Sequence, residues 1–162
     1  TKDEALARLA RNYFRSHTPA TLQDFVWWSG LSVTEAKQGI YLIGSELTEE
    51  QWKGQTWYLH ESGRTRGSIK GHIRFLPPYD ELLLGYKDRT DVLLSEHCSK
   101  AFTGNGLFFP VILYEGQIVG NWDRKAKRNG CDPGYSLFRQ ESRIDEALLD
   151  KAQQQYMQFL GK

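Results

Sequence analysis

Two short stretches of this sequence concentrate positively charged side chains. The first, HESGRTRGSIKGHIRF at residues 60–75, contains Arg64 and Arg66. The second, NWDRKAKRNG at residues 121–130, contains Arg124, Lys125, Lys127 and Arg128. Clustered lysine and arginine side chains can bind phosphate oxygens, the contact that dominates the affinity of proteins for DNA. Solvated loops are also commonly charged, so neither stretch by itself distinguishes a phosphate-binding surface from an ordinary one.

Asp80 is the most distinctive single polar residue, in the stretch FLPPYDELLLGY at residues 75–86. Prolines and a tyrosine precede it and leucines follow closely, so its carboxylate can be partly buried. A buried carboxylate must be paired or carry a shifted pKa, which makes Asp80 a weak candidate for a catalytic base. The alternative, which we favour, is that Asp80 caps the N-terminus of the short helix that follows.

The sequence lacks the motifs of several enzyme classes. It contains no G-x-x-x-x-G-K-[ST], no G-x-S-x-G, no H-E-x-x-H and no dinucleotide-binding glycine pattern. A metal site built from His97, Cys98 and Cys131 is conceivable, but their spacing is typical of unliganded residues. We therefore expect no metal, no cofactor and two reduced cysteines.

Three helices are predicted within residues 3–44. The first covers residues 3–16, where apolar side chains recur at helical spacing: Leu6, Leu9, Tyr13 and Phe14. The second begins after Thr21 in TLQD and ends at Ser29-Gly30, and the third begins after Ser32 in SVTE. Both starts match the capping box, in which two side chains three residues apart each bind the other residue's backbone N–H.

The helical period also predicts which of these side chains are buried. The second helix should bury Leu22, Phe25 and Val26, and the third should bury Val33, Ala36, Ile40 and Ile43. Adjacent residues on a helix point about 100° apart. We therefore expect either Trp27 or Trp28, and not both, to be largely buried.

A β-hairpin is predicted between residues 46 and 60, where Trp52 precedes the turn Lys53-Gly54-Gln55 and further aromatic residues follow it. Three short helices followed by a hairpin are typical of the winged helix, and we predict such a DNA-binding unit over residues 1–62. Its third helix would direct polar side chains outward to bases or phosphates: Thr34, Lys37, Gln38 and Tyr41. An exposed helix must carry polar residues whatever it does.

The composition changes after residue 60, and we predict a β-rich C-terminal domain over residues 63–162. A short helix is expected at 79–86, a hairpin with strands at 108–114 and 117–122 around Glu115-Gly116, and a third strand in GYSLFRQ. An amphipathic helix near 143–160 closes the chain. The predicted fold class is α+β: a winged helix-turn-helix followed by a β-rich part that ends in this amphipathic helix.

Composition limits the class of protein without indicating its function. The chain has 162 residues, 40% of them hydrophobic, which is enough for one full-sized domain or two small ones. No apolar run is long enough to span a membrane and the N-terminus does not resemble a signal peptide, so we expect a cytoplasmic protein without membrane contacts. The formal net charge of +1 does not by itself predict a nucleic-acid binder. Because the first residue is Thr, we expect a piece of a longer protein.

Three blocks of the sequence resemble one known family: YFRSHTPATLQDFVWWSGLSVTEAKQGI, LPPYDELLLGYKDR and GLFFPVILYEGQIVGNW. In this order they are similar to the winged-helix DNA-binding family that includes the AlkZ-like DNA glycosylases, bacterial enzymes that excise bulky alkylated bases and unhook interstrand crosslinks. The resemblance covers nearly all of the chain. It implies a bacterial protein of winged-helix units and a β-rich C-terminal part, which binds double-stranded DNA without a metal.

The catalytic motif of that family has no counterpart in this sequence. Characterised glycosylases of the family place Gln-x-Gln or Gln-x-Asp near the N-terminus of a chain about twice as long. The cluster Gln153–Gln155 lies in the predicted C-terminal helix and does not align with that motif. No catalytic residue is therefore carried over, and we expect a C-terminal portion whose enzymatic activity is an open question.

Three functions are compatible with these observations. The first is the DNA-binding portion of a repair-glycosylase-like protein, the second a transcription-regulator-like module, and the third a protein-interaction module built on a winged helix. A regulator should prefer particular sequences through contacts with base edges, whereas a repair protein should bind any duplex mainly through phosphates. We favour the first, because the paired caps, the hairpin, the two basic stretches and the family blocks occur together in one sequence. The near-neutral net charge supports the interaction module.

Overall fold

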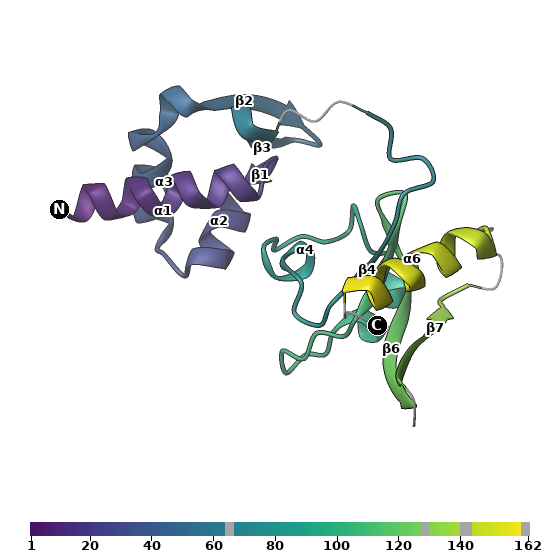
Figure 1. The fold of residues 1–162 in the computed structure, drawn as a ribbon. Coiled ribbons are helices and arrows are strands. Elements are labelled where there is room, and N and C mark those ends of the chain that lie inside the picture. The colour runs from purple at the N-terminus through teal and green to yellow at the C-terminus, as the bar shows by residue number, and fades with distance from the viewer. Residues whose placement is uncertain (64–66, 128–129, 140–143, 160–162) are drawn as a thin grey trace. The chain divides into compact units, whose positions relative to one another are not determined.

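The computed structural model separates a helical region from a sheet region along the chain (Figure 1). It describes residues 1–63, 67–127, 130–139 and 144–159, and of residues 124–127, 130–133 and 159 it describes the backbone only. Close contacts divide the chain into two units. The first comprises Thr1–Gly67 and Leu84–Asp88, and the second Ser68–Leu83 and Arg89–Lys162. The α+β class expected from the sequence is confirmed.

The first unit consists of three helices and a small antiparallel sheet. The helices are α1 (Lys2–Ser16), α2 (Leu22–Ser29) and α3 (Val33–Leu42). The strands are β1 (Ala20–Thr21), β2 (Leu47–Trp52) and β3 (Gln55–His60), and their order in the sheet is β1-β3-β2. Short 3-10 helices flank the hairpin: η1 (Gly44–Glu46) and η2 (Glu61–Gly63). The three helices and the hairpin predicted from the sequence are therefore confirmed.

Capping boxes begin α2 and α3, as the sequence predicts. The Asp24 N–H donates to Thr21 Oγ1 (3.2 Å), and the Thr21 N–H donates to the Asp24 carboxylate (2.9 Å). Ser32 and Glu35 form the same pair of hydrogen bonds at the start of α3 (3.3 and 3.2 Å). Gly30 follows α2 with a φ of 68°, a left-handed conformation that glycine adopts without a Cβ clash. Local residues thus determine the turn between the two helices.

The core of the first unit is formed by side chains from all three helices. Its fully buried members include Tyr13, Phe14, Phe25, Ala36 and Ile43. Leu22 and Val26 are half-buried at its edge. The apolar faces predicted for the three helices therefore meet in one interior.

Two burial predictions for these helices are wrong. Val33 is 44% exposed, because it is the first residue of α3 and the buried face of that helix begins at Ala36. Trp27 and Trp28 are 52% and 36% exposed, so neither is largely buried. Other aromatic rings already fill the interior beside α2, so Trp28 only borders it, with its ring centroid 5.1 Å from that of Tyr13.

Residues Leu84–Asp88 belong to the first unit, although their neighbours on both sides in the chain belong to the second. Hydrogen bonds hold this segment, among them those from Tyr13 Oη to the Gly85 carbonyl (2.8 Å), from Trp27 Nε1 to the Leu84 carbonyl (3.2 Å), and from the Lys87 N–H to the Asp24 carboxylate (2.9 Å). Burial and the nearby Asp24 raise the pKa of Tyr86 to about 12. The sequence predicted one boundary, between residues 62 and 63. It did not predict that a later segment, Leu84–Asp88, belongs to the first unit.

The second unit contains a four-stranded antiparallel sheet. Its strands follow one another in chain order: β4 (Ile73–Leu76), β5 (Val111–Tyr114), β6 (Gln117–Lys127) and β7 (Gly130–Leu137). Short helices lie between β4 and β5 in the chain: α4 (Glu81–Leu84), η3 (Ser95–His97) and α5 (Cys98–Ala101). After β7 comes α6 (Glu146–Phe159), which confirms the predicted closing helix.

Alternating side chains give this sheet two covered faces. Ile112 and Trp122 pack with Leu149 of α6. Val111, the neighbour of Ile112 on the same strand, instead packs with Leu93 and other residues of the segment between β4 and β5. Successive side chains of a strand point to opposite faces, so neighbouring residues of β5 contribute to the two different buried clusters of the second unit.

The basic stretch after residue 123 is mostly strand, whereas the sequence predicted a loop. β6 was expected to end at residue 122, but it continues to Lys127, and Arg124 lies opposite Pro133 of β7. A polar run shows no alternation of apolar residues, so the pattern that predicts strands is missing there. β5 begins at Val111, three residues later than the predicted start at 108.

Candidate nucleic-acid interface

The outer face of α3 carries residues that the sequence predicts to contact DNA. Gly39 lies on the inner face, where an added Cβ would be only 3.2 Å from the Leu6 carbonyl of α1, so the two helices pack closely. The outer face exposes Thr34, Lys37 and Tyr41, and Tyr41 is 83% exposed. Within the described part of the chain, Thr34 and Lys37 have no side-chain partner. Both side chains can therefore reach a ligand.

Two other polar side chains of α3 are bound to α1. Gln38 Nε2 donates to Asp3 Oδ1 (2.6 Å), and Lys2 Nζ lies 2.8 Å from Glu35 Oε1. The Lys2 ammonium, together with Ser32, lowers the pKa of the Glu35 carboxyl to about 2. The bond to Asp3 uses one N–H of the Gln38 amide and leaves its carbonyl oxygen and second N–H for other contacts.

The tip of the β2–β3 hairpin is an exposed aromatic surface that we did not identify as a site from the sequence. Trp52 is 50% exposed, and its ring centroid lies 5.5 Å from that of Trp57, with the rings inclined by 65°. Lys53 Nζ lies 4.2 Å from the centroid of the Trp52 ring, within the range of a cation–π interaction. The sequence did contain a signal. The two tryptophans flank the Lys-Gly turn, and the period of two along paired strands places both on the same face of the hairpin.

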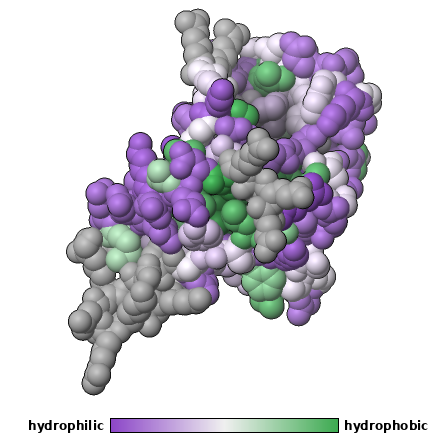
Figure 2. Space-filling view, turned by 90° about the vertical axis from the view of Figure 1, so that its right-hand side faces the viewer, coloured by the Kyte–Doolittle hydropathy of each residue, from purple (hydrophilic) through white to green (hydrophobic). Residues whose placement is uncertain are grey.

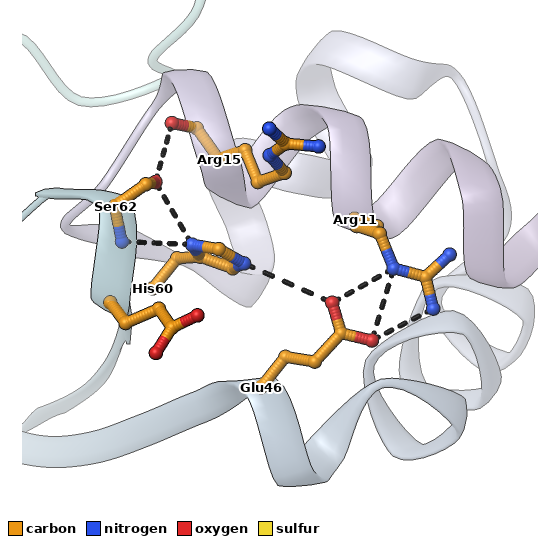
Figure 3. A pocket seen from close by; sticks show the side chains of 6 residues that line it. Arg11, Arg15, Glu46, His60 and Ser62 are labelled. Atoms are coloured by element: carbon orange, nitrogen blue, oxygen red, sulfur yellow. Dashed lines mark hydrogen bonds and ion pairs between the residues drawn. The ribbon is translucent and has the colours of Figure 1, made fainter.

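A polar pocket of about 460 Å³ lies at the other end of the hairpin (Figure 3). Its lining comes from α1, η1, the end of β3 and η2: Arg11, Arg15, Glu46, His60, Glu61 and Ser62. These residues are far apart in the sequence, and their individual types carry no motif. The pocket was therefore not predicted from the sequence.

Arg11 and Glu46 form the strongest interaction in this pocket. Arg11 Nε donates to both oxygens of the Glu46 carboxylate (3.0 and 2.8 Å), and Arg11 Nη2 donates to Oε1 (2.7 Å). These hydrogen bonds hold the pKa of Glu46 below its usual range and raise the pKa of Arg11. His60 Nε2 lies 3.8 Å from the same carboxylate. The guanidinium thus joins α1 to the start of the hairpin.

The side chains of His60 and Ser62 complete the network, and His60 is only 7% exposed. His60 Nδ1 accepts the Ser62 N–H (3.1 Å), so the proton of the neutral ring is assigned to Nε2, which faces Glu46. Ser62 Oγ donates to the Arg15 carbonyl (3.0 Å). The same oxygen lies 2.9 Å from His60 Nδ1, so two acceptors lie within hydrogen-bond distance of its one proton. The cluster links the end of α1 to the end of the hairpin.

Arg15 is the group in this pocket that can still bind an anion. Its guanidinium has no partner among the residues that the structure describes, and no dashed line reaches it in Figure 3. Glu46 neutralises Arg11, however, and Glu61 also lines the pocket. The pocket as a whole therefore carries little net positive charge.

The basic residues predicted to bind phosphates are only partly placed. Arg64, Arg66 and Arg128 lie outside the described residues. Arg124, Lys125 and Lys127 have their backbone in β6, and nothing is described of their side chains. The contribution of these two stretches to DNA binding stays a prediction.

Asp80 forms the contact of a helix cap. Its Oδ1 accepts the Leu82 N–H (2.9 Å), and α4 begins at the next residue, Glu81. The favoured interpretation of Asp80 as a cap is consistent with this geometry. A catalytic role for its carboxylate stays untested.

The described residues also bear on metal binding and on membrane insertion. Among the side chains that the structure describes, no three His, Cys, Asp or Glu residues are close enough to share a metal ion. Cys98 is a free thiol, and nothing is described of the Cys131 side chain. None of the helices in the described ranges is both long and apolar enough to cross a membrane.

Comparison with known proteins defines the class to which these features belong. The family model described as DNA glycosylase AlkZ-like matches residues 1–159. The chain therefore belongs to the AlkZ-like DNA glycosylase family, as the resemblance of its sequence blocks predicted.

A curated protein and a solved structure are similar to the chain. The interstrand DNA cross-link repair glycosylase of Streptomyces sahachiroi is 29% identical over 128 residues, which cover 75% of this chain and 34% of that protein. The solved structure of the DNA glycosylase AlkZ from Streptomyces sahachiroi matches with a TM-score of 0.76 and 25% identity, over 93% of this chain and 41% of that one. The chain thus spans well under half the length of either relative.

Proposed function

We propose that this chain is the DNA-binding portion of a DNA-repair protein that acts on alkylated or crosslinked bases. The observation that carries the proposal is the family match over residues 1–159. It is supported by the similarity to an interstrand DNA cross-link repair glycosylase and to the fold of a DNA glycosylase. Double-stranded DNA is the proposed ligand.

The first unit is proposed to act as a winged helix in this binding. Support comes from the short turn at Gly30 between α2 and α3, and from the hairpin that follows them in a sheet of order β1-β3-β2. In helix-turn-helix proteins the second helix lies in the major groove. Thr34 and Lys37 would then be the α3 side chains nearest to DNA.

Binding is proposed to depend mainly on phosphates and little on base sequence. Each Lys or Arg that contacts a phosphate releases counterions, so affinity falls as salt rises. In titrations of labelled duplexes of two unrelated sequences at several salt concentrations, Arg124→Ala/Lys125→Ala should reduce the slope of log K against log salt by about one unit per contacting cation. The control is Lys100→Ala/Lys151→Ala, which removes the same charge from exposed positions outside the proposed surface.

Each result of this titration bears on the proposal. Salt-independent binding, or no binding of duplex DNA, would contradict it and favour the protein-interaction module, which the net charge of +1 already favours. A strong preference for one of the two duplexes would favour the transcription-regulator-like module. An unchanged slope in Arg124→Ala/Lys125→Ala alone would remove these two residues from the DNA surface.

We infer that the chain by itself has no glycosylase activity. The family places its Gln-x-Gln or Gln-x-Asp motif near the N-terminus, whereas the Gln-x-Gln of this sequence, Gln153–Gln155, lies in α6 and does not align with that motif. Incubation with a duplex that carries an alkylated purine, followed by alkaline cleavage, should give no strand breaks. Breaks that disappear in Asp80→Asn would contradict this inference and make the Asp80 carboxylate a catalytic base. Breaks that persist in Asp80→Asn would place the catalytic group elsewhere in the chain.

A further inference from the structure

The hairpin tip, defined as Trp52, Lys53, Gly54 and Trp57, places two indole rings on one side of the sheet. Trp52 lies opposite Gln55, and Trp57 follows Gln55 by two residues, so the two tryptophans share a face. Tyr58 is on the other face, where it packs against the core of the first unit. The tryptophans therefore project away from that core.

The tip is held in place before any ligand binds. Lys53 and Gly54 both have positive φ (50° and 73°), the conformation of the tight two-residue turn that matches the twist of paired strands. Trp57 Nε1 donates to the Trp52 carbonyl (3.3 Å), and Gln51 Nε2 donates across the strands to Thr56 Oγ1 (2.8 Å). A side chain that is already ordered loses little entropy on binding.

The hairpin tip leaves aromatic surface in water that is available to a ligand. On the face shown in Figure 2, hydrophilic residues predominate, with a group of hydrophobic residues near its centre and further hydrophobic residues apart from that group. Trp52, at 50% exposed, leaves a large part of an indole in water. Covering such a ring removes apolar surface from water and is favourable.

We propose that Trp52 stacks on a nucleobase that is unpaired or displaced from the DNA stack, while Lys53 binds an adjoining phosphate. A ligand complementary to an aromatic ring beside a cation is itself aromatic and anionic, and a nucleotide has both properties. The ammonium of Lys53, 4.2 Å from the ring centroid, sits on a flexible side chain that can move to the phosphate when the base arrives.

Glu50 limits what else this surface can bind. It lies opposite Trp57 on the same face of the hairpin, where its carboxylate repels a run of backbone phosphates. The site therefore favours a single base on the ring over a length of regular duplex backbone. This inference rests on the proposed function, because it takes DNA as the ligand and adds the feature of DNA that the first unit recognises.

The test compares two labelled duplexes that differ only in one central unpaired nucleotide. The wild-type chain should bind the duplex with the unpaired base more tightly. Trp52→Ala should weaken that binding roughly tenfold and binding of the fully paired duplex less than about twofold. Trp52→Phe, which keeps an aromatic ring, should retain most of the preference. Phe109→Ala is the matched control, because it also removes an exposed aromatic ring, 37% exposed, but one outside the hairpin tip.

Two charge variants separate stacking from electrostatics. Lys53→Gln should reduce the salt slope by about one unit for the duplex with the unpaired base. Glu50→Gln should strengthen binding of both duplexes by roughly twofold, because it removes a repulsive charge from the edge of the site. Thermal unfolding followed by circular dichroism shows whether each variant is folded at the temperature of the titration.

The outcomes distinguish this inference from the proposed function. Equal wild-type affinity for the two duplexes, or an equal loss for both in Trp52→Ala, overturns the stacking inference and leaves DNA binding intact. A Trp52→Ala variant that binds both duplexes like the wild type also overturns it, and then an apolar protein segment becomes the candidate ligand of the tip. Failure of the wild-type chain to bind either duplex overturns the proposed function as well.

Discussion

The two ends of the β2–β3 hairpin differ in what their side chains contact. At the hairpin base, defined as Arg11, Glu46, His60 and Ser62, polar groups bind one another within the first unit. At the hairpin tip, Trp52 is half-exposed and carries the Lys53 ammonium over its ring. Polar groups that are satisfied within the protein stabilise the fold, whereas exposed groups on a rigid frame are available to a ligand. We therefore expect the hairpin base to determine the stability of the fold and the hairpin tip to determine the affinity for DNA.

The largest expected effect at the hairpin base is that of His60→Ala. The change removes a buried ring and leaves the Ser62 N–H without its acceptor, so the free energy of unfolding should fall by about 2 kcal/mol. Urea unfolding measures this loss, and a duplex titration should show unchanged affinity. His72→Ala is the control, since His72 is exposed and should affect neither quantity. A folded His60→Ala variant with weaker DNA binding would show that the two ends are not separate in function.

Glu46→Gln should have a smaller effect that depends on pH. Arg11 holds the pKa of Glu46 below its usual range, so the carboxylate contributes stability above its unfolded pKa, near 4.5, and loses it as pH falls through the folded value. Because the pair is partly exposed, we expect a loss of about 1 kcal/mol at pH 7. The difference between wild type and variant should shrink below pH 4.5.

The measurement for Glu46 is urea unfolding between pH 3 and pH 7. Glu61→Gln is the matched control, because Glu61 lines the same pocket but has no partner in the described part of the chain. A constant difference between wild type and Glu46→Gln over the whole pH range would show that the charge of Glu46 does not stabilise the base. In that case packing of the side chain would explain its effect.

The smallest expected effect is that of Gln51→Ala, midway along the hairpin. The Gln51 amide bonds to Thr56 Oγ1 on an exposed part of the strands, so its loss should cost about 0.5 kcal/mol in stability. If this bond helps to order the tip, affinity for the duplex with the unpaired base should fall by less than about twofold. A larger loss of affinity than of stability would extend the ligand-binding end of the hairpin to Gln51.

The candidate site illustrates which features can be predicted before a structure is known. Thr34 and Lys37 were predicted on an exposed helical face, and the structure exposes both. The aromatic tip was recognisable as a hairpin but not as a site, because exposure of an indole depends on what the rest of the chain leaves uncovered. The pairing of Arg11 with Glu46 was not predictable, since 35 residues separate them and neither type indicates its partner.

Local interactions explain what the sequence by itself determined. The capping boxes at Thr21 and Ser32, the left-handed Gly30 and the turn at Glu115-Gly116 each depend on residues within four positions of one another. Their geometry follows from the backbone preferences of a few neighbouring residues. The starts of α2 and α3 and the turns at Gly30 and Glu115-Gly116 were therefore predicted correctly.

Tertiary structure decided the features that depend on distant partners. Tyr13 holds the carbonyl of Gly85, 72 residues away, and so determines that Leu84–Asp88 belong to the first unit. The exposure of Trp27 and Trp28 follows from the rings that already fill the core, and the extension of β6 to Lys127 follows from pairing with β7. Each of these depends on which segments meet in space, because burial and strand pairing are properties of the partner as much as of the residue itself.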